Sequence, residues 1–280
     1  MRVLVTGLDG FTGQYVEKAL LKAGHEVIGL SANLLDIDSL AEEISSKQPE
    51  AVIHLAAIAF VAHGNVDELY QVNLIGTRHL LNVLAQHVPN IKKIVIASSA
   101  NVYGNTEGIL DESATPAPAN DYAVSKLAME YMVQLWHKQL PILLVRPFNY
   151  TGVGQADNFL IPKIVSHFKQ KAKSIELGNL EVWRDFGDVR SVADAYVQLL
   201  EKAPIGETVN LCSGKLYALR EIIDMCQLLT GHSMPVVVNP DFVRANEVKR
   251  LCGDNTKLRT FLPDWEMPEL KETLEWMLKE

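Results

Sequence analysis

The chain has 280 residues, of which 48% are hydrophobic and 21% charged, and its net charge is −8. This composition is that of a folded globular protein, and the negative charge gives no general attraction for nucleic acid or for an anionic membrane. No stretch has the length and hydropathy of a membrane span or of a signal peptide. The three cysteines, Cys212, Cys226 and Cys252, have no metal-ligand spacing, so we expect reduced thiols in a cytoplasmic protein and no metal site.

Short apolar runs alternate with helical patterns over the first half of the chain. We predict strands at residues 2–6, 25–30, 51–55, 91–97 and 142–146. Between them we predict helices through residues 15–21, 37–46, 67–87 and 122–137. This alternation is typical of an α/β protein with a doubly wound parallel sheet. His54, at the end of an apolar strand, is expected to be a buried, hydrogen-bonded residue.

The pattern becomes less regular after Pro147. We predict helices at 161–170, 189–202, 219–229 and 268–278, and strands at 207–211 and 234–238. From this change we predict two domains. Residues 1–147 plus 186–212 would form the doubly wound domain, and residues 148–185 plus 213–280 a smaller mixed α/β substrate lobe.

A glycine triplet, Gly7-x-x-Gly10-x-x-Gly13, lies between the first predicted strand and the first predicted helix. Glycines at such a position allow a tight turn and let the backbone approach a pyrophosphate, which lies at the helix N-terminus. Ordinary turns also need glycine, so the triplet alone is weak evidence. Its strand–turn–helix context favours dinucleotide binding, and therefore a Rossmann-type domain.

A tyrosine and a lysine, Tyr122 and Lys126, are four residues apart in a predicted helix and so share one of its faces. A phenol has a pKa near 10 and exchanges protons poorly at neutral pH unless a cation stabilises its anion. Lys126 would supply that cation, and the hydroxyl of Ser99 would hold a carbonyl oxygen beside Tyr122. The spacing is common, however, and by itself is compatible with an ordinary surface position.

Six segments resemble, in the same order, those of the extended short-chain dehydrogenase/reductases and their NAD-dependent epimerase/dehydratase family. They are Thr6 to Gly13, His54-Leu55-Ala56-Ala57, Asn73-x-x-Gly76-Thr77, Ser98-Ser99-x-x-Val102-Tyr103-Gly104, Tyr122-x-x-x-Lys126 and Arg146-Pro147-Phe148-Asn149. The resemblance implies that Ser99, Tyr122 and Lys126 are catalytic. Tyr122 would exchange a proton with a sugar hydroxyl or carbonyl, and Ser99 would orient the substrate oxygen. Lys126 would hold the nicotinamide ribose and lower the pKa of Tyr122.

The same resemblance implies a bound NAD or NADP. The residues expected to contact it are Gly7, Gly10, Phe11, Thr12, Gly13, Ser31, Asp36, Ile37, Leu55, Ala56, Ala57, Tyr122, Lys126 and Pro147. An acid after the second strand binds a ribose 2′-hydroxyl, and an arginine accommodates a 2′-phosphate. The segment 30–33 contains neither, so the sequence leaves NAD and NADP open. Asp36 resembles the family's adenine-binding aspartate and suits equally well an N-cap of the next helix.

Residues 184–190 and 243–248 resemble the clamp that nucleotide-sugar enzymes form around diphosphate and ribose. A guanidinium group binds phosphate oxygens bidentately, which suits arginine to that role. The residues expected to contact a nucleotide-diphosphate sugar are Ser99, Asn149, Lys163, Arg184, Arg244 and Glu247. Arg190 is expected instead to pair with a neighbouring aspartate.

Ala100 and Asn101 occupy positions where the family's dehydratases carry an acidic residue, so dehydration is disfavoured. Segments 146–155 and 244–258 resemble GDP-4-keto-6-deoxy-D-mannose reductases. They imply NAD(P)H-dependent reduction of the C4 ketone of an NDP-4-keto-6-deoxyhexose, with a dTDP sugar as a second possibility. A UDP-sugar 4-epimerase and a non-catalytic NAD(P)-sensing regulator are the alternatives. The resemblance also implies a homodimer, in which helices 73–87 and 122–137 pair across a two-fold axis.

Overall fold

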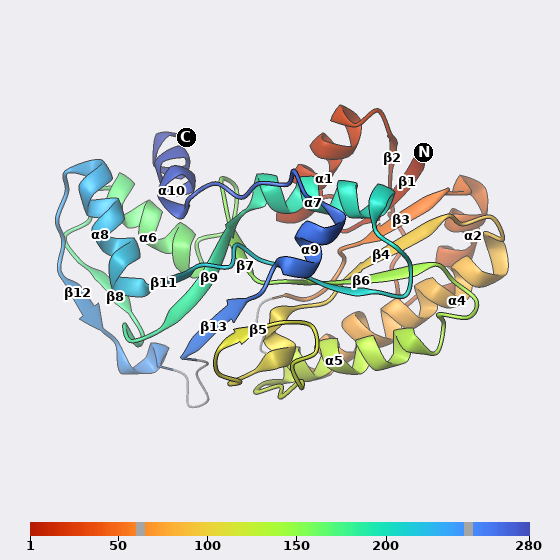
Figure 1. Cartoon of the computed structure of the whole chain (residues 1–280), viewed down its shortest axis with the longest axis horizontal. Coiled ribbons are helices and arrows are strands. Elements are labelled where there is room, and N and C mark those ends of the chain that lie inside the picture. Colours follow the sequence, from red (N-terminus) through yellow and green to blue (C-terminus); the bar gives the residue numbers. More distant parts are fainter. Residues whose placement is uncertain (60–64, 244–248) are drawn as a thin grey trace.

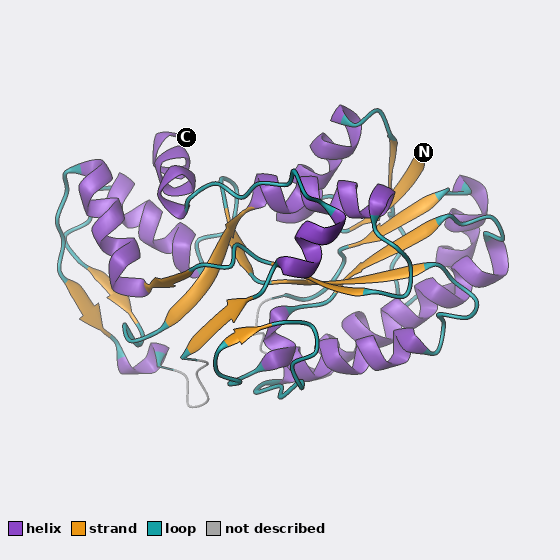
Figure 2. Cartoon of the chain, in the orientation of Figure 1, coloured by secondary structure: helices purple, strands orange, loops and turns teal. Residues whose placement is uncertain are grey.

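The protein is described by a computed structural model that covers residues 1–59, 65–243 and 249–280 (Figures 1 and 2). Its largest sheet has six strands in the order β10–β6–β4–β3–β1–β2, and all neighbours are parallel. The strands are β1 (Arg2–Thr6), β2 (Glu26–Gly29), β3 (Ala51–His54), β4 (Lys93–Ala97), β6 (Ile142–Pro147) and β10 (Thr208–Leu211). The order reverses between β1 and β3, and such a switch point is where open α/β sheets bind ligands.

Helices cover both faces of this sheet because alternate strand residues point to opposite sides. Val3 and Val5 join a buried cluster with Val16 of α1 (Phe11–Lys22) and Tyr196 of α7 (Val189–Lys202). Leu4, between the two valines, belongs to the cluster on the other face. That cluster is covered by α2 (Ile37–Lys47), α4 (Thr77–His87) and α5 (Asp121–Gln134). The predicted Rossmann-type sheet is confirmed.

The single helix predicted for residues 67–87 is wrong in detail, because a π-helical segment interrupts it. The structure has α3 (Val66–Tyr70), then the π-helix η1 (Gln71–Gly76), then α4. Within η1, the Asn73 side chain accepts from the Ile58 backbone N–H and donates to the Ser125 hydroxyl. Wider turns of this kind re-aim a side chain without ending the helix. Apolar periodicity does not reveal such a contact.

The other strands and helices occupy the left and centre of Figure 1. One sheet has the order β11 (Leu216–Ala218), β9 (Trp183–Asp188), β13 (Arg250–Gly253) and β5 (Ile109–Leu110), and β7 (Asn149–Thr151) pairs with β9. A second sheet joins β12 (Val236–Val238) to β8 (Ile175–Leu177). Short helical segments are η2 (Ala100–Tyr103), η3 (Pro240–Phe242) and α9 (Thr256–Phe261).

Three helices share a core with the left-hand sheets: α6 (Leu160–Lys169), α8 (Leu219–Thr230) and α10 (Leu270–Lys279). Their buried contacts include Ile164, Ile222 and Leu274. β5, which was assigned to the doubly wound domain, pairs with β13 of the predicted substrate lobe. The domain boundaries given above stay a prediction. Among the described residues, no helix combines the length and apolar character needed to cross a bilayer.

Candidate active site

The glycine turn between β1 and α1 is tight enough to exclude side chains. A Cβ atom on Gly13 would lie 2.2 Å from the carbonyl oxygen of Gly7 and 2.5 Å from that of Leu8. Gly7 has φ +71°, and a Cβ there would lie 3.0 Å from the Ala56 amide nitrogen. The first turn of α1 contains no acidic residue, and its N-terminal N–H groups and helix dipole favour an anion there. The turn therefore fits a dinucleotide pyrophosphate.

A buried chain of hydrogen bonds holds the loop after β3 beneath this turn. The Thr6 hydroxyl oxygen accepts from the amides of Leu55 and Ala56, at 3.1 and 3.0 Å. His54 contacts Thr6 through Nδ1 at 2.7 Å and Thr77 through Nε2 at 2.9 Å. Thr77 donates its own proton to the Asn73 carbonyl, so it accepts from Nε2–H of His54. Burial lowers the pKa of His54 to about 3, which keeps the ring neutral and makes it a structural residue, as expected.

The predicted catalytic residues Ser99, Tyr122 and Lys126 are all buried and come from neighbouring elements. Ser99 follows β4 and caps η2, while Tyr122 and Lys126 lie in the first turns of α5. Asn120 begins α5 by accepting from the Ala123 amide at 2.9 Å. The Ser99 hydroxyl lies near enough to Tyr122 to act on the phenol, since it acts to lower the pKa of Tyr122. The structure thus brings these two together at the carboxyl edge of the sheet.

Burial is the dominant influence on the titration of this group. It raises the pKa of Tyr122 to about 12, although the hydrogen bond from Ser99 acts in the opposite direction. Burial likewise lowers the pKa of Lys126 to about 8, against the attraction of Glu130. Lys126 donates from Nζ to the Ala97 carbonyl at 2.9 Å. The expectation that Lys126 lowers the pKa of Tyr122 is therefore not met here, because its ammonium is directed to the backbone and desolvation prevails.

Three further residues shape the site, although none of them was predicted to contact cofactor or substrate. Asn101 donates to the Ser99 oxygen from both its backbone N–H and its side-chain amide, each at 3.1 Å. Tyr150 bonds Thr12 through its hydroxyl at 2.7 Å and stacks on Phe11, with ring centroids 6.2 Å apart. Glu43 accepts from the Ser31 amide at 2.9 Å. Each contact joins segments distant in sequence or depends on backbone geometry, so no local sequence pattern predicted it.

A buried ion pair lies beneath the Tyr122 helix. Glu130, one turn beyond Lys126, accepts from Nε and Nη2 of Arg146, at 2.9 and 2.6 Å. Arg146 also donates to the Tyr103 hydroxyl at 2.9 Å, and Ser98 donates to Glu130. Tyr103 and Arg146 belong to the segments that carry the family resemblance. Their role in the structure is to fasten α5 to β4 and β6.

The remaining residues predicted to bind cofactor lie along the same edge or next to it. Asp36 is the N-cap of α2 and accepts from the Ser39 amide at 3.1 Å, which leaves its predicted adenine contact untested. Ile37 is the first residue of α2, and Pro147 is the last residue of β6. Ala57 follows Ala56 in the loop below the glycine turn.

Three of the residues predicted to bind the sugar nucleotide donate hydrogen bonds to backbone carbonyls of the protein. Asn149 donates to the Asp185 carbonyl at 3.3 Å, and Lys163 donates to the Glu176 carbonyl at 2.7 Å. Arg184 donates from Nη1 to the carbonyls of Trp183 and Lys249, at 2.9 and 3.1 Å. Arg244 and Glu247 lie outside the described residues. The phosphate clamp therefore stays a prediction.

Arg190, by contrast, pairs with Asp188 at 2.6 Å, as expected from the sequence.

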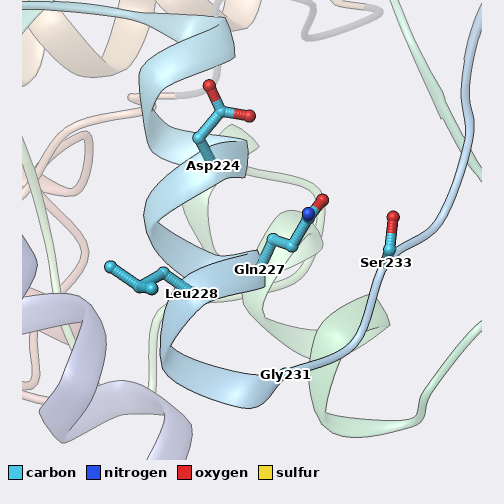
Figure 3. A pocket seen from close by; sticks show the side chains of 5 residues that line it. All are labelled: Asp224, Gln227, Leu228, Gly231 and Ser233. Atoms are coloured by element: carbon cyan, nitrogen blue, oxygen red, sulfur yellow. The ribbon is translucent and has the colours of Figure 1, made fainter.

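A surface pocket at the end of α8 is separate from all of these residues. Figure 3 shows Asp224, Gln227, Leu228, Gly231 and Ser233 around it, and none of them was predicted to belong to the site. Within the described part of the chain, no group of three or more His, Cys, Asp or Glu side chains is arranged to hold a metal ion.

Comparison with known proteins places this geometry in context. Residues 3–212 match the NAD dependent epimerase/dehydratase family. The chain is 37% identical to GDP-6-deoxy-D-talose 4-dehydrogenase of Aggregatibacter actinomycetemcomitans, over 100% of this chain and 97% of the relative. It is 34% identical to GDP-6-deoxy-D-mannose reductase of Pseudomonas aeruginosa, over 95% and 97%.

Solved structures agree with these sequence relatives. A crystal structure from Burkholderia cenocepacia J2315 has a TM-score of 0.94 and 46% identity, over 99% of this chain and 97% of that one. RMD from Pseudomonas aeruginosa, solved as a complex with NADPH, has a TM-score of 0.90 and 32% identity, over 99% and 97%.

Proposed function

Because the chain belongs to the NAD dependent epimerase/dehydratase family, we propose that it uses NADH or NADPH to reduce the C4 ketone of an NDP-4-keto-6-deoxyhexose. The names of its two relatives specify GDP-linked 6-deoxyhexoses. GDP-4-keto-6-deoxy-D-mannose is therefore the favoured substrate, and a dTDP-4-keto-6-deoxyhexose is the second choice. The product is the corresponding 6-deoxyhexose with a hydroxyl at C4.

The observation that carries this proposal is the placement of Ser99 and Tyr122, both buried, with Ala100 and Asn101 rather than an acidic residue directly after Ser99. Ala100 is buried, and Asn101 presents an amide to Ser99. An amide is not a base for a carbon-bound proton, which dehydration of the sugar requires. Hydride transfer at a single carbon needs only a hydride donor and a proton for the oxygen, and this site offers the proton.

A nicotinamide cofactor, when bound at the glycine turn, supplies the hydride. Tyr122 gives its phenolic proton to the C4 oxygen as negative charge develops there, so the C=O π bond becomes a C–H and an O–H bond. Ser99 donates a hydrogen bond to the same oxygen. Because both groups are buried, their contacts to a developing oxyanion are stronger than in water. We assign Lys126 to the nicotinamide ribose, which its ammonium would reach by adding to or replacing its bond to the Ala97 carbonyl.

Asn101 sets the direction of the Ser99 hydroxyl. A hydroxyl oxygen has two acceptor positions, and the two N–H groups of Asn101 occupy them. The Ser99 proton is then free to point toward Tyr122 or toward a substrate oxygen. This direction agrees with the effect of Ser99 on Tyr122, whose pKa it acts to lower.

The nucleotide-sugar contacts complete the proposal. We assign Asn149, Lys163, Arg184, Arg244 and Glu247 to the sugar nucleotide, with the arginines on the diphosphate. Lys163 and Arg184 now donate to backbone carbonyls, and phosphate oxygens would add to or replace these partners.

The enzyme would work in the cytoplasm as a homodimer. A stripe of exposed apolar residues on α5 supports helix pairing: Val124, Tyr131 and Leu135 are 38%, 57% and 77% exposed. Their spacing of seven and four residues places them on one face of the helix.

A test of the function follows directly. The protein is incubated with GDP- and dTDP-4-keto-6-deoxyhexoses, with NADH and NADPH in separate reactions, and the sugar product is identified. Cofactor oxidation with the GDP substrate supports the proposal. A 4-epimerase, which the family name also covers, would purify with NAD bound and convert UDP-sugars without net oxidation. A non-catalytic NAD(P) sensor would bind cofactor and turn over none of them.

A further inference from the structure

Two backbone amides directly after β2 are occupied by an anion from the protein itself. The Ser31 N–H donates to Oε1 of Glu43 at 2.9 Å, and the Ala32 N–H donates to Oε2 at 2.6 Å. Glu43 lies in α2, and its side chain is 16% exposed. Lys47, one turn further on, pairs with the same carboxylate and donates to the Gly29 carbonyl at 2.7 Å. Both carboxylate oxygens of Glu43 and the ammonium of Lys47 are thus engaged.

This cluster lies beside the glycine turn. In the sheet, Val5 of β1 is directly opposite Gly29 of β2. Leu8 of the glycine turn packs against Gly29, where an added Cβ would lie 2.9 Å from its Cδ2 atom. In Rossmann-type domains, the adenosine ribose meets the protein at the carboxyl end of the second strand. The amides of Ser31 and Ala32 would therefore lie next to the atoms that distinguish NAD from NADP when a cofactor is bound.

We propose that Glu43 makes this protein prefer NAD(H) to NADP(H). A 2′-phosphate at this position needs free N–H groups or an unpaired cation. Glu43, however, already binds both amides and pairs with Lys47. The 2′-phosphate would also place its negative charge next to the Glu43 carboxylate. A ribose 2′-hydroxyl, in contrast, is attracted to Glu43, because it can donate a hydrogen bond to a carboxylate oxygen.

The carboxylate stays ionised at neutral pH. Burial acts to raise the pKa of Glu43, but the bonds from Lys47, Ser31 and Ala32 outweigh it, and the pKa lies below its ordinary value. Glu43 comes from the helix after β2, whereas the usual acid lies at the strand end itself. This explains why residues 30–33 alone left the cofactor open. The relative solved with NADPH shows that family membership does not dictate this preference.

The inference rests on the proposed function only in that a nicotinamide cofactor binds at the glycine turn, so its test omits the sugar. NADH and NADPH are titrated into the intact protein by calorimetry. We expect NADH to bind at least about tenfold more tightly than NADPH. Equal affinity, or tighter binding of NADPH, would overturn the proposal without any variant. Failure of both cofactors to bind would instead refute the proposed function, and the preference with it.

Two variants locate the cause. Glu43→Gln keeps the size of the side chain and removes its charge, and Glu43→Ala empties the position. We expect each to tighten NADPH binding by about tenfold, while NADH binding is unchanged or weaker. Glu42→Gln, at an exposed position on the same helix, is the control and should leave both affinities unchanged. An unaltered NADH-to-NADPH ratio in a folded Glu43→Gln variant would show that Glu43 does not set the preference.

Discussion

Asn101 holds the Ser99 hydroxyl oxygen with two hydrogen bonds of 3.1 Å, one from its backbone and one from its side chain. Asn101 thereby directs the serine proton outward, toward Tyr122 and the place for a substrate oxygen. Asn101 therefore has two effects. It places an amide where a dehydratase has an acidic residue, and it orients the Ser99 hydroxyl, the second hydrogen-bond donor of the site.

Asn101→Asp should lower kcat by about tenfold, because an ionised carboxylate accepts the Ser99 proton that the amide leaves free. Steady-state kinetics with GDP-4-keto-6-deoxy-D-mannose would measure the loss, and calorimetry should show unchanged cofactor affinity. Asn105→Asp, an exposed position nearby, is the control for added charge. An unchanged kcat in Asn101→Asp would mean that the orientation of Ser99 does not matter.

Lys126 should make the stability of the protein rise with pH relative to a neutral replacement. Burial lowers its pKa from 10.5 to about 8, so between these values the unfolded chain binds more protons than the folded one. The penalty for holding the ammonium is full below pH 8 and disappears above the unfolded pKa. Urea unfolding at pH 7 and 9.5 should therefore favour the wild type over Lys126→Met by on the order of 2 kcal/mol more at the higher pH. A difference that does not change with pH would contradict the lowered pKa.

Arg146→Met should destabilise the protein by about 3 kcal/mol, because it leaves the buried Glu130 carboxylate without its partner. Adding Glu130→Gln to this variant should recover part of the loss, since the unpaired charge is then gone. Lys279→Met removes an exposed ion pair with Glu275 and should cost less than about 0.5 kcal/mol. Chemical denaturation gives all three values. If the double variant is no more stable than Arg146→Met, the ion pair is not the cause.

Gly13→Ala should abolish cofactor binding, since its Cβ would lie 2.2 Å from the Gly7 carbonyl oxygen and the turn must open. The matched control is Gly206→Ala. Gly206 has φ +81° and no atom within 4 Å of an added Cβ, so this variant should lose only about 1 kcal/mol of stability. Calorimetric titration with NADH distinguishes the two. Normal binding by Gly13→Ala would show that the turn does not hold the pyrophosphate.

The sequence was sufficient for features that depend on local patterns. The strand–glycine–helix segment predicted the turn after β1, and the four-residue spacing predicted that Tyr122 and Lys126 share a face of α5. The alternation of strands and helices predicted the doubly wound parallel sheet. The chemical roles of Tyr122 and Lys126 stay predictions, as do the contacts to the sugar nucleotide.

Features that depend on distant segments were not accessible from the sequence. Glu43 binds the amide of Ser31, twelve residues earlier, and Tyr150 bonds Thr12, which is 138 residues away. Within the π-helix, the Asn73 side-chain amide is hydrogen-bonded to Ile58 and Ser125, and neither contact has a periodic signature in the sequence. The pKa of Tyr122 depends on how completely the phenol is buried, which only the assembled fold determines.

The most direct test of Tyr122 as proton donor is a single-turnover measurement with Tyr122→Phe. Enzyme loaded with NADH is mixed with GDP-4-keto-6-deoxy-D-mannose, and NADH oxidation is followed alongside the sugar product. We expect the wild type to form the 6-deoxyhexose and Tyr122→Phe to react about a thousandfold more slowly with unchanged NADH affinity. A variant that reduces the ketone at nearly the wild-type rate would contradict the assignment.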